Sequence, residues 1–174
     1  MKKILLISDN HSYVANELLP FVEEADEIWH AGDIGSLNSV LIFEKRKTFR
    51  AVYGNIDDAD TRMTYPLRQC FECEGLKILI THIGGYPGRY PATIKKWIMD
   101  EKADVFICGH SHICKVMYDS KLNHWHFNPG AYGHHGFHHI RTALRFSIDG
   151  KKISDLSVIE LGKRGRETNE MTIK

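Results

Sequence analysis

The sequence lacks a long apolar run. A helix that spans a membrane needs about 20 consecutive apolar residues, and no stretch of the 174 residues approaches that length. Residues 4–7 follow two lysines, as in a secretory signal, but this apolar segment is too short for one, and Asp9 follows almost at once. The sequence therefore predicts a cytoplasmic protein without a membrane segment.

An excess of charge of one sign is also missing. Lys and Arg together number 23 against 22 Asp and Glu, which leaves a formal net charge of +1. A protein that binds nucleic acid through its overall charge is strongly basic. The balance predicts no strong affinity for nucleic acid or for an anionic membrane.

Cysteines are few, at Cys70, Cys73, Cys108 and Cys114. A zinc ribbon needs two close pairs, and only the first pair has that spacing. Four free thiols in a reducing compartment are the better interpretation.

The length fits one domain with a substantial core. We expect it to cover residues 1–162, and residues 163–174, which are charged and poor in apolar side chains, to form a poorly ordered tail. Aromatic residues in the C-terminal strands are compatible with a homo-oligomer, either a dimer or a tetramer.

Strand and helix patterns alternate in the first third of the chain. This order predicts a parallel sheet with right-handed crossovers. The expected strands cover residues 2–8, 27–32 and 49–54, and the expected helices cover residues 14–25, with Pro20 near a start or break, and 36–46, with Ser36 as its N-cap.

The rest of the chain is richer in strands. Residues 68–82 predict a hairpin around Glu74–Gly75, and residues 91–103 predict a helix. Strands expected at 104–109, 114–119, 124–130, 142–149 and 152–161 suggest a mostly antiparallel second half. Two sheets packed together with helices outside fit this pattern. On one of these strands, His124 and His126 alternate around Trp125 and are expected on an exposed face, whereas His30 is expected in the core.

Metal-type ligands follow five of the predicted strands. Singly, each of these histidines and acids would be a structural residue, but open α/β sheets build their sites at the carboxyl ends of strands. Two carboxylates, four imidazoles and one amide favour Mn²⁺, Fe²⁺ or Zn²⁺. Seven ligands suit two ions that share a carboxylate, and such a centre keeps a positive charge that attracts phosphate. The seven are Asp9, His11, Asp33, Asn55, His82, His110 and His112.

In chain order these residues form the motifs D-x-H, G-D, G-N, a histidine after a strand, and G-H-x-H. The series resembles the calcineurin-like metallophosphoesterase superfamily from Asp9 to Gly130, and the short chain resembles its small, uncapped bacterial and archaeal phosphodiesterases. The resemblance implies an α/β fold, a four-layer α/β/β/α sandwich of two packed mixed sheets flanked by helices, with a dinuclear metal site at the strand ends.

The resemblance also implies roles for these residues. One metal would be held by Asp9, His11 and His112, and the other by Asn55, His82 and His110, with Asp33 bridging the two. Manganese is the expected metal, with iron, zinc or nickel as alternatives. The implied reaction is hydrolysis of a phosphoester, most simply a small-molecule phosphodiester, by a hydroxide that bridges the two ions, so Asp33 and Asn55 are also catalytic candidates.

One position departs from the family pattern. Many members carry a histidine directly after the G-N asparagine, where it can protonate the leaving group, and this chain has Ile56. Proton donation contributes about 10²–10⁴ in rate, so a substitute is expected or the substrates are restricted. Asp57 and a histidine of residues 134–139, with His134 or His135 preferred, are the candidates.

A second function is compatible with the same fold. The chain also resembles the small subunit of the retromer coat, in which this fold serves protein binding. We favour catalysis because all seven ligand positions are intact. A nuclease is disfavoured by the near-neutral charge.

Overall fold

The computed structural model describes residues 1–165 and contains two five-stranded sheets packed face to face. The first has the order β10-β9-β1-β2-β3, and the second has the order β4-β5-β6-β8-β7. The strands are β1 (Lys2–Ile7), β2 (Glu27–His30), β3 (Thr48–Ala51), β4 (Arg68–Cys73), β5 (Leu76–Thr81), β6 (Val105–Ile107), β7 (Cys114–Asp119), β8 (His124–Pro129), β9 (Ile140–Asp149) and β10 (Lys152–Lys163). Strand β10 enters the predicted tail by one residue, and residues 166–174 lie outside the described part.

The first sheet contains the predicted parallel core. Strand β2 pairs in parallel with both β1 and β3, while β9 is antiparallel to β1 and to β10. The first crossover contains η1 (Asn16–Leu18) and α1 (Leu19–Glu24). Pro20 lies in the first turn of α1, where a helix tolerates proline. The second crossover has only η2 (Leu37–Ser39) and α2 (Leu41–Glu44), so the helix predicted over 36–46 is shorter than expected.

The C-terminal strands are mostly antiparallel, as predicted, and the exception is β6 at the centre of the second sheet. Strand β6 is parallel to both β5 and β8, and only the outer pairs β4–β5 and β7–β8 are antiparallel. Helix α4 (Ala92–Glu101) provides the crossover from β5 to β6, and β9 and β10 return to the first sheet. The hairpin turn is confirmed, with positive φ at Glu74 and Gly75. A helix that the pattern missed, α3 (Ala59–Thr64), begins at Asp58, whose carboxylate accepts a hydrogen bond from the Thr61 amide at 2.9 Å.

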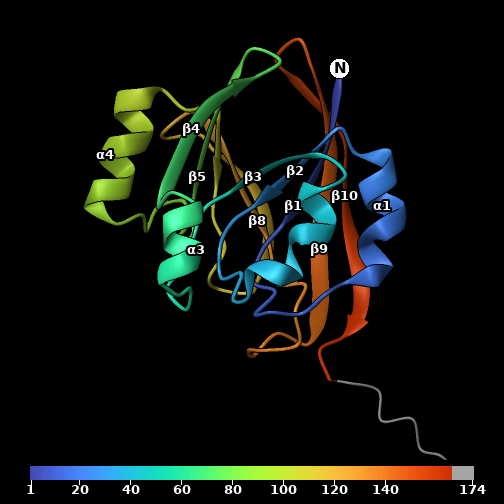
Figure 1. Cartoon of the computed structure of the whole chain (residues 1–174). Helices are drawn as coiled ribbons and strands as arrows, with labels where there is room; N and C mark the ends of the chain where they lie inside the picture. Colours follow the sequence, from blue (N-terminus) through green and yellow to red (C-terminus); the bar gives the residue numbers. More distant parts are fainter. Residues whose placement is uncertain (166–174) are drawn as a thin grey trace, which may run out of the picture.

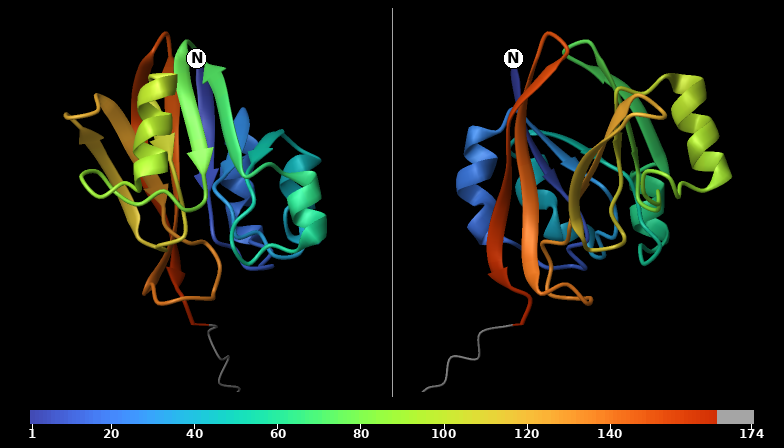
Figure 2. Two further views of the ribbon diagram at one scale, coloured as in Figure 1. Left: turned by 90° about the vertical axis from the view of Figure 1, so that its left-hand side faces the viewer. Right: turned by 180° about the vertical axis from the view of Figure 1, so that it is seen from behind.

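Three apolar clusters fill the spaces between the layers. The central cluster lies between the sheets and includes Trp29 and Phe127. A second cluster, with Leu18 and Phe43, fills the space under α1 and α2, and the third, with Ile98, lies under α4. Figures 1 and 2 show α1 and α4 on opposite sides of the two sheets. The predicted four-layer α/β/β/α sandwich is confirmed. Each fully buried large apolar side chain contributes about 1.5–3 kcal/mol.

The prediction for β8 was wrong about which side chains are exposed. His124 and His126 are buried, at 1% and 0% exposure, whereas Trp125 between them is 38% exposed. The hydroxyl of Tyr90 lies 3.0 Å from a ring nitrogen of each histidine. Because this hydroxyl supplies a polar partner, the two imidazoles can be buried on the α4 side of the sheet.

All four cysteines are free thiols. Within residues 1–165, no cysteine belongs to a group of metal-ligand type, and no helix has the length and apolar character required to traverse a bilayer.

Candidate metal centre

The candidate ligands lie in loops where the two sheets meet. In the first sheet, the Asp9 amide donates to the Gly32 carbonyl at 3.0 Å, and the His11 amide donates to the Asp33 carbonyl at 3.1 Å. These bonds keep the loops after β1 and β2 side by side. The amide of His110, which follows β6, donates to Oδ2 of Asp9 at 3.1 Å. This last bond joins the strand ends of one sheet to those of the other.

Six of the seven predicted ligands form two groups, each of which could hold a metal ion. In each group the ligand atoms all lie within 4.8 Å of one another. The shortest pairs are Nε2 of His112 with Oδ1 of Asp9, at 3.1 Å, and Nε2 of His82 with Oδ1 of Asp33, at 3.2 Å. The first group is Asp9, His11 and His112, and the second is Asp33, His82 and His110.

Unpartnered polar atoms test whether a cation fits here. Oδ1 of Asp9, Nε2 of His11 and Nε2 of His82 are buried and have no hydrogen-bond partner within residues 1–165. Leaving a buried polar atom without a partner costs about 1–3 kcal/mol. All three atoms can carry a lone pair, and a divalent cation in each of the two groups would satisfy them. The residues therefore fit metal ions.

The remaining atoms of these ligands are already bonded in a way that orients them. Nδ1 of His82 donates to the Ala31 carbonyl at 2.8 Å, which leaves Nε2 with its lone pair. Oδ2 of Asp9 accepts from the Ser8 hydroxyl at 2.6 Å, and Oδ1 stays free. Such outer contacts commonly fix the tautomer and direction of a metal ligand. The sequence analysis did not identify Ser8, because a serine next to an aspartate is too common to indicate a role.

Asp33 lies between the two groups. Its Oδ1 is 3.2 Å from Nε2 of His82, in the second group, and its Oδ2 is 3.7 Å from Nε2 of His11, in the first. The Ile56 amide donates to Oδ1 at 3.1 Å and fixes the carboxylate. One carboxylate thus presents an oxygen to each group.

Charge and burial oppose each other in these loops. Burial acts to raise the pKa of Asp33, but the neighbouring His82 and His11 rings and the Ile56 amide together outweigh it, and the pKa lies below its usual value. Burial acts to lower the pKa of His82, but the neighbouring carboxylates of Asp33 and Asp9 together outweigh it and raise the pKa. For His11, burial prevails and lowers the pKa. Asp33 is therefore ionised at neutral pH, as a metal ligand must be.

The backbone is strained at these ligands. Non-glycine residues rarely adopt a positive φ, which costs of the order of 1–3 kcal/mol and clusters at functional sites. Five of the candidates have it: Asp9 (57°), His11 (46°), Asp33 (56°), His110 (69°) and His112 (58°). The tight turns direct the side chains of several loops toward one place.

Two positions of the motifs require glycine because atoms of neighbouring residues lie too close for a side chain. A Cβ on Gly54 would lie 2.0 Å from Oδ1 of Asp33, and one on Gly109 would lie 2.1 Å from the Ser8 hydroxyl oxygen. A side chain at either position would displace an acidic ligand or its support. This explains in physical terms why G-N and G-H begin with glycine.

Asn55, Asp57 and His134 lie around these groups. Asn55 is exposed on the loop after β3, and it lines a hollow of about 360 Å³ together with His82. Asp57 is buried, and its carboxylate accepts from the Gly35 amide at 2.6 Å and the Gly54 amide at 2.7 Å. These bonds connect the loops after β2 and β3, so its carboxylate oxygens are engaged with the backbone.

His134 packs edge-on against Tyr13, with ring centroids 4.5 Å apart, and its Nδ1 contacts the Arg164 carbonyl. It shares a second hollow, of about 630 Å³, with His11 and His135. The ring of His135 lies 4.8 Å from that of His11. Both histidines preferred in the sequence interpretation thus border the first group.

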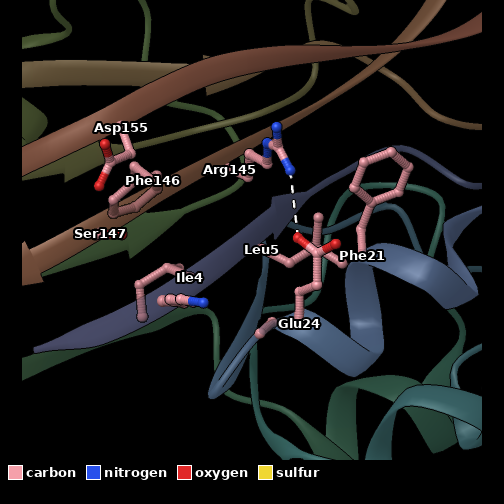
Figure 3. A pocket seen from close by; sticks show the side chains of 10 residues that line it. Ile4, Leu5, Phe21, Glu24, Arg145, Phe146, Ser147 and Asp155 are labelled. Atoms are coloured by element: carbon pink, nitrogen blue, oxygen red, sulfur yellow. Dashed lines mark hydrogen bonds and ion pairs between the residues drawn. The ribbon is translucent and has the colours of Figure 1, made fainter.

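A third hollow, of about 320 Å³, lies beside α1 and is bordered by Phe21 and Phe146. Figure 3 shows the guanidinium of Arg145 reaching across it to Glu24, at 3.3 Å. Within the described residues, its lining contains none of the candidate ligands. It is separate from the candidate metal centre.

A sandwich of two mixed sheets with two adjacent groups of aspartate and histidine defines a protein of the metal-dependent phosphoesterase type. The model of the calcineurin-like phosphoesterase superfamily domain matches residues 1–151. The chain therefore belongs to the calcineurin-like phosphoesterase superfamily, as its motifs predicted.

Solved structures show the same fold. A predicted phosphoesterase from Streptococcus pneumoniae is 22% identical, with a TM-score of 0.72 over 94% of this chain and 90% of that one. A Thermotoga maritima protein is 26% identical, with a TM-score of 0.70 over 92% and 100%. Zinc-bound Vps29 (Vacuolar Protein Sorting 29) from Entamoeba histolytica is 13% identical, with a TM-score of 0.70 over 91% and 98%. No match was found among curated proteins.

Proposed function

We propose that the protein is a metal-dependent phosphodiesterase with two divalent ions. Asp9, His11 and His112 would hold one ion, and Asn55, His82 and His110 the other, with Asp33 shared. When bound, such ions would polarise the phosphoryl oxygens and activate a water molecule for in-line attack on phosphorus. Manganese is the proposed metal, with iron, zinc or nickel as alternatives.

The chain's own residues orient the ligands and bind the substrate. Ser8 and Ala31 hold Asp9 and His82 in ligating orientations. The hollow next to Asn55 and His82 also contains Arg62 and Arg68, whose charges suit the phosphoryl group or an anionic substituent. Arg62 is fixed in place because its Nε donates to the Asp57 carbonyl at 2.7 Å and its Nη2 to the Asn55 carbonyl at 3.1 Å.

Two features support a diester with a good leaving group. The lining of the hollow also includes the apolar residues Leu67 and Ile83, which suit an organic substituent. Ile56, 44% exposed, occupies the position next to Asn55 where many family members carry a histidine that can protonate the leaving group. Asp57 and His134 stay candidates for a helper role.

The observation that carries the proposal is the set of buried, unpartnered atoms of Asp9, His11 and His82. We would measure bound metal, and turnover of bis(p-nitrophenyl) phosphate and p-nitrophenyl phosphate with and without Mn²⁺. Faster cleavage of the diester, lost with a chelator and in Asp33→Asn, is expected. Activity that survives both changes would contradict the proposal.

The cytoplasm is the proposed location, and four free thiols support a reducing compartment. A homo-oligomer stays a prediction. Tyr118 and Trp125, a pair of exposed rings 5.3 Å apart on β7 and β8, are the surface that supports it.

A metal-binding scaffold for protein partners is the second candidate. The fold likeness to Vps29 favours it, since those structures include a zinc complex and a complex with a cyclic peptide. Tight metal binding with no turnover of either aryl ester would favour this candidate over the enzyme.

A further inference from the structure

The loop from Gly133 to His139 packs against one of the candidate ligands. It leads into β9 and lies at the lower end of that strand in Figure 1. Nδ1 of His138 is 3.3 Å from Nδ1 of His112, and the two rings meet edge to face with centroids 5.2 Å apart. On its other side, Nε2 of His138 is 3.1 Å from the Gly133 carbonyl oxygen.

These contacts form a chain whose proton positions can be deduced. The Gly133 carbonyl only accepts, so Nε2 of His138 carries the hydrogen. A neutral imidazole has one N–H, so Nδ1 of His138 is an acceptor. The proton between the two rings then belongs to Nδ1 of His112, and Nε2 of His112 keeps its lone pair.

The lone pair on Nε2 of His112 lies next to the other ligand atoms of the first group. Nε2 of His112 is 3.1 Å from Oδ1 of Asp9, yet Oδ1 has no hydrogen-bond partner within residues 1–165. The two atoms are therefore neighbours that are not hydrogen-bonded to each other, as two ligands of one cation are.

The two groups obtain this orientation in different ways. His82 donates from Nδ1 to a backbone carbonyl next to β2, at Ala31, whereas His112 depends on a side chain of a surface loop. The loop fits closely, because a Cβ on Gly136 would lie 2.0 Å from Nδ1 of His112. Replacing the residue at 138 should therefore affect the first group and leave the second unchanged.

We propose that His138 is a positioning residue that holds His112 in the tautomer with Nδ1–H, so that Nε2 can ligate the ion of the Asp9–His11–His112 group. The inference rests on the proposed metal centre, but it concerns metal affinity rather than turnover. Loss of such an outer partner typically lowers metal affinity about 10–100-fold.

Calorimetric titration with Mn²⁺ tests this in the full chain. His138→Phe keeps an aromatic ring and removes the acceptor, and we expect one of two binding events to weaken about 10–100-fold. His138→Gln, which restores an acceptor oxygen, should recover most of the affinity. His139→Phe, at an exposed position of the same loop, is the matched control and should bind like the wild type.

A second measurement does not require the variants to fold. Long-range ¹H–¹⁵N spectra of the zinc-loaded wild type should show His112 protonated at Nδ1 and His138 at Nε2. Protonation of His112 at Nε2, unchanged Mn²⁺ affinity in folded His138→Phe, or absence of metal binding would each overturn the inference. A protein that binds metal as predicted but cleaves no phosphoester would contradict the proposed function alone.

Discussion

Oδ1 of Asp33 lies 3.2 Å from Nε2 of His82, although the two residues are 49 positions apart and belong to loops of different sheets. The contact exists because the strand ends of both sheets open on the same side. Asp33 also presents Oδ2 to His11, at 3.7 Å. A small displacement of this carboxylate would affect both ligand groups.

Gly54→Ala should displace Asp33. The added Cβ would lie 2.0 Å from Oδ1 of Asp33 and 2.4 Å from its amide nitrogen. We expect destabilisation of about 1–3 kcal/mol, typical of overpacking, and loss of metal-dependent activity. Urea unfolding and Mn²⁺ titration measure the two effects. Gly165→Ala, where no atom of residues 1–165 would lie within 4 Å of the added Cβ, is the control, and equal metal affinity in both variants would contradict the expectation.

Acid should destabilise the protein through His30. Burial lowers the pKa of His30 to about 3, while its Nε2 donates to Oδ1 of Asn10 at 2.9 Å. Below pH ~6.5 the His30 imidazole binds a proton in the unfolded chain but stays neutral in the folded protein. Stability is therefore complete above that pH and falls by up to about 1.4 kcal/mol per unit as the pH drops toward 3.

Urea unfolding of the wild type and His30→Gln at pH 7, 6 and 5 checks this. The glutamine amide can still accept from Gly32 and donate to Asn10, so the variant should fold. Its free energy of unfolding should fall less steeply below pH 6.5. Identical slopes would show that His30 does not control this part of the pH dependence.

Cleavage should depend strongly on the leaving group. Because Ile56 cannot donate a proton, aryl diesters with poor leaving groups should react much more slowly than nitrophenyl diesters. Ile56→His should accelerate the poor substrates by up to about 10²-fold and change the good ones little. Ile56→Leu is the apolar control. A flat dependence in the wild type would indicate that another residue, such as Asp57 or His134, donates the proton.

Arg68 should contribute to substrate binding. It borders the hollow that contains His82, and its guanidinium lies 5.0 Å from the ring centroid of Trp97. Arg68→Gln should raise KM for a diester that carries an additional anionic group by roughly 2–5-fold, the effect of one exposed charge, without changing kcat. Lys45→Gln removes an exposed charge outside this hollow and should leave KM unaltered.

Much of the fold and all six ligands of the two groups were predictable from the sequence. Ligand types recur after apolar strands, and parallel strands bring their carboxyl ends to one edge. The grouping of Asp9 with His11 and His112 agrees with the resemblance. The parallel pairing of β6 with β5 and β8 was not predicted, because a short apolar strand does not reveal its partner. The return of β9 to β1 depends on packing between segments far apart in the chain.

The supporting contacts could not be predicted. Positive φ at Asp9 and Asp33 is imposed by the turns and leaves no sequence pattern. His126 was misplaced because alternation gives two faces without saying which one is buried, and Tyr90, its partner, lies in a distant loop. His138 stands among four similar histidines, and only its contact with His112 distinguishes it.

Anomalous diffraction from crystals soaked in Mn²⁺ tests the central claim most directly. We expect two anomalous peaks on either side of Asp33, one among Asp9, His11 and His112 and the other among His82, His110 and Asn55. A single peak elsewhere, or no peak at these loops in a crystal that contains manganese, would contradict a dinuclear centre at this edge.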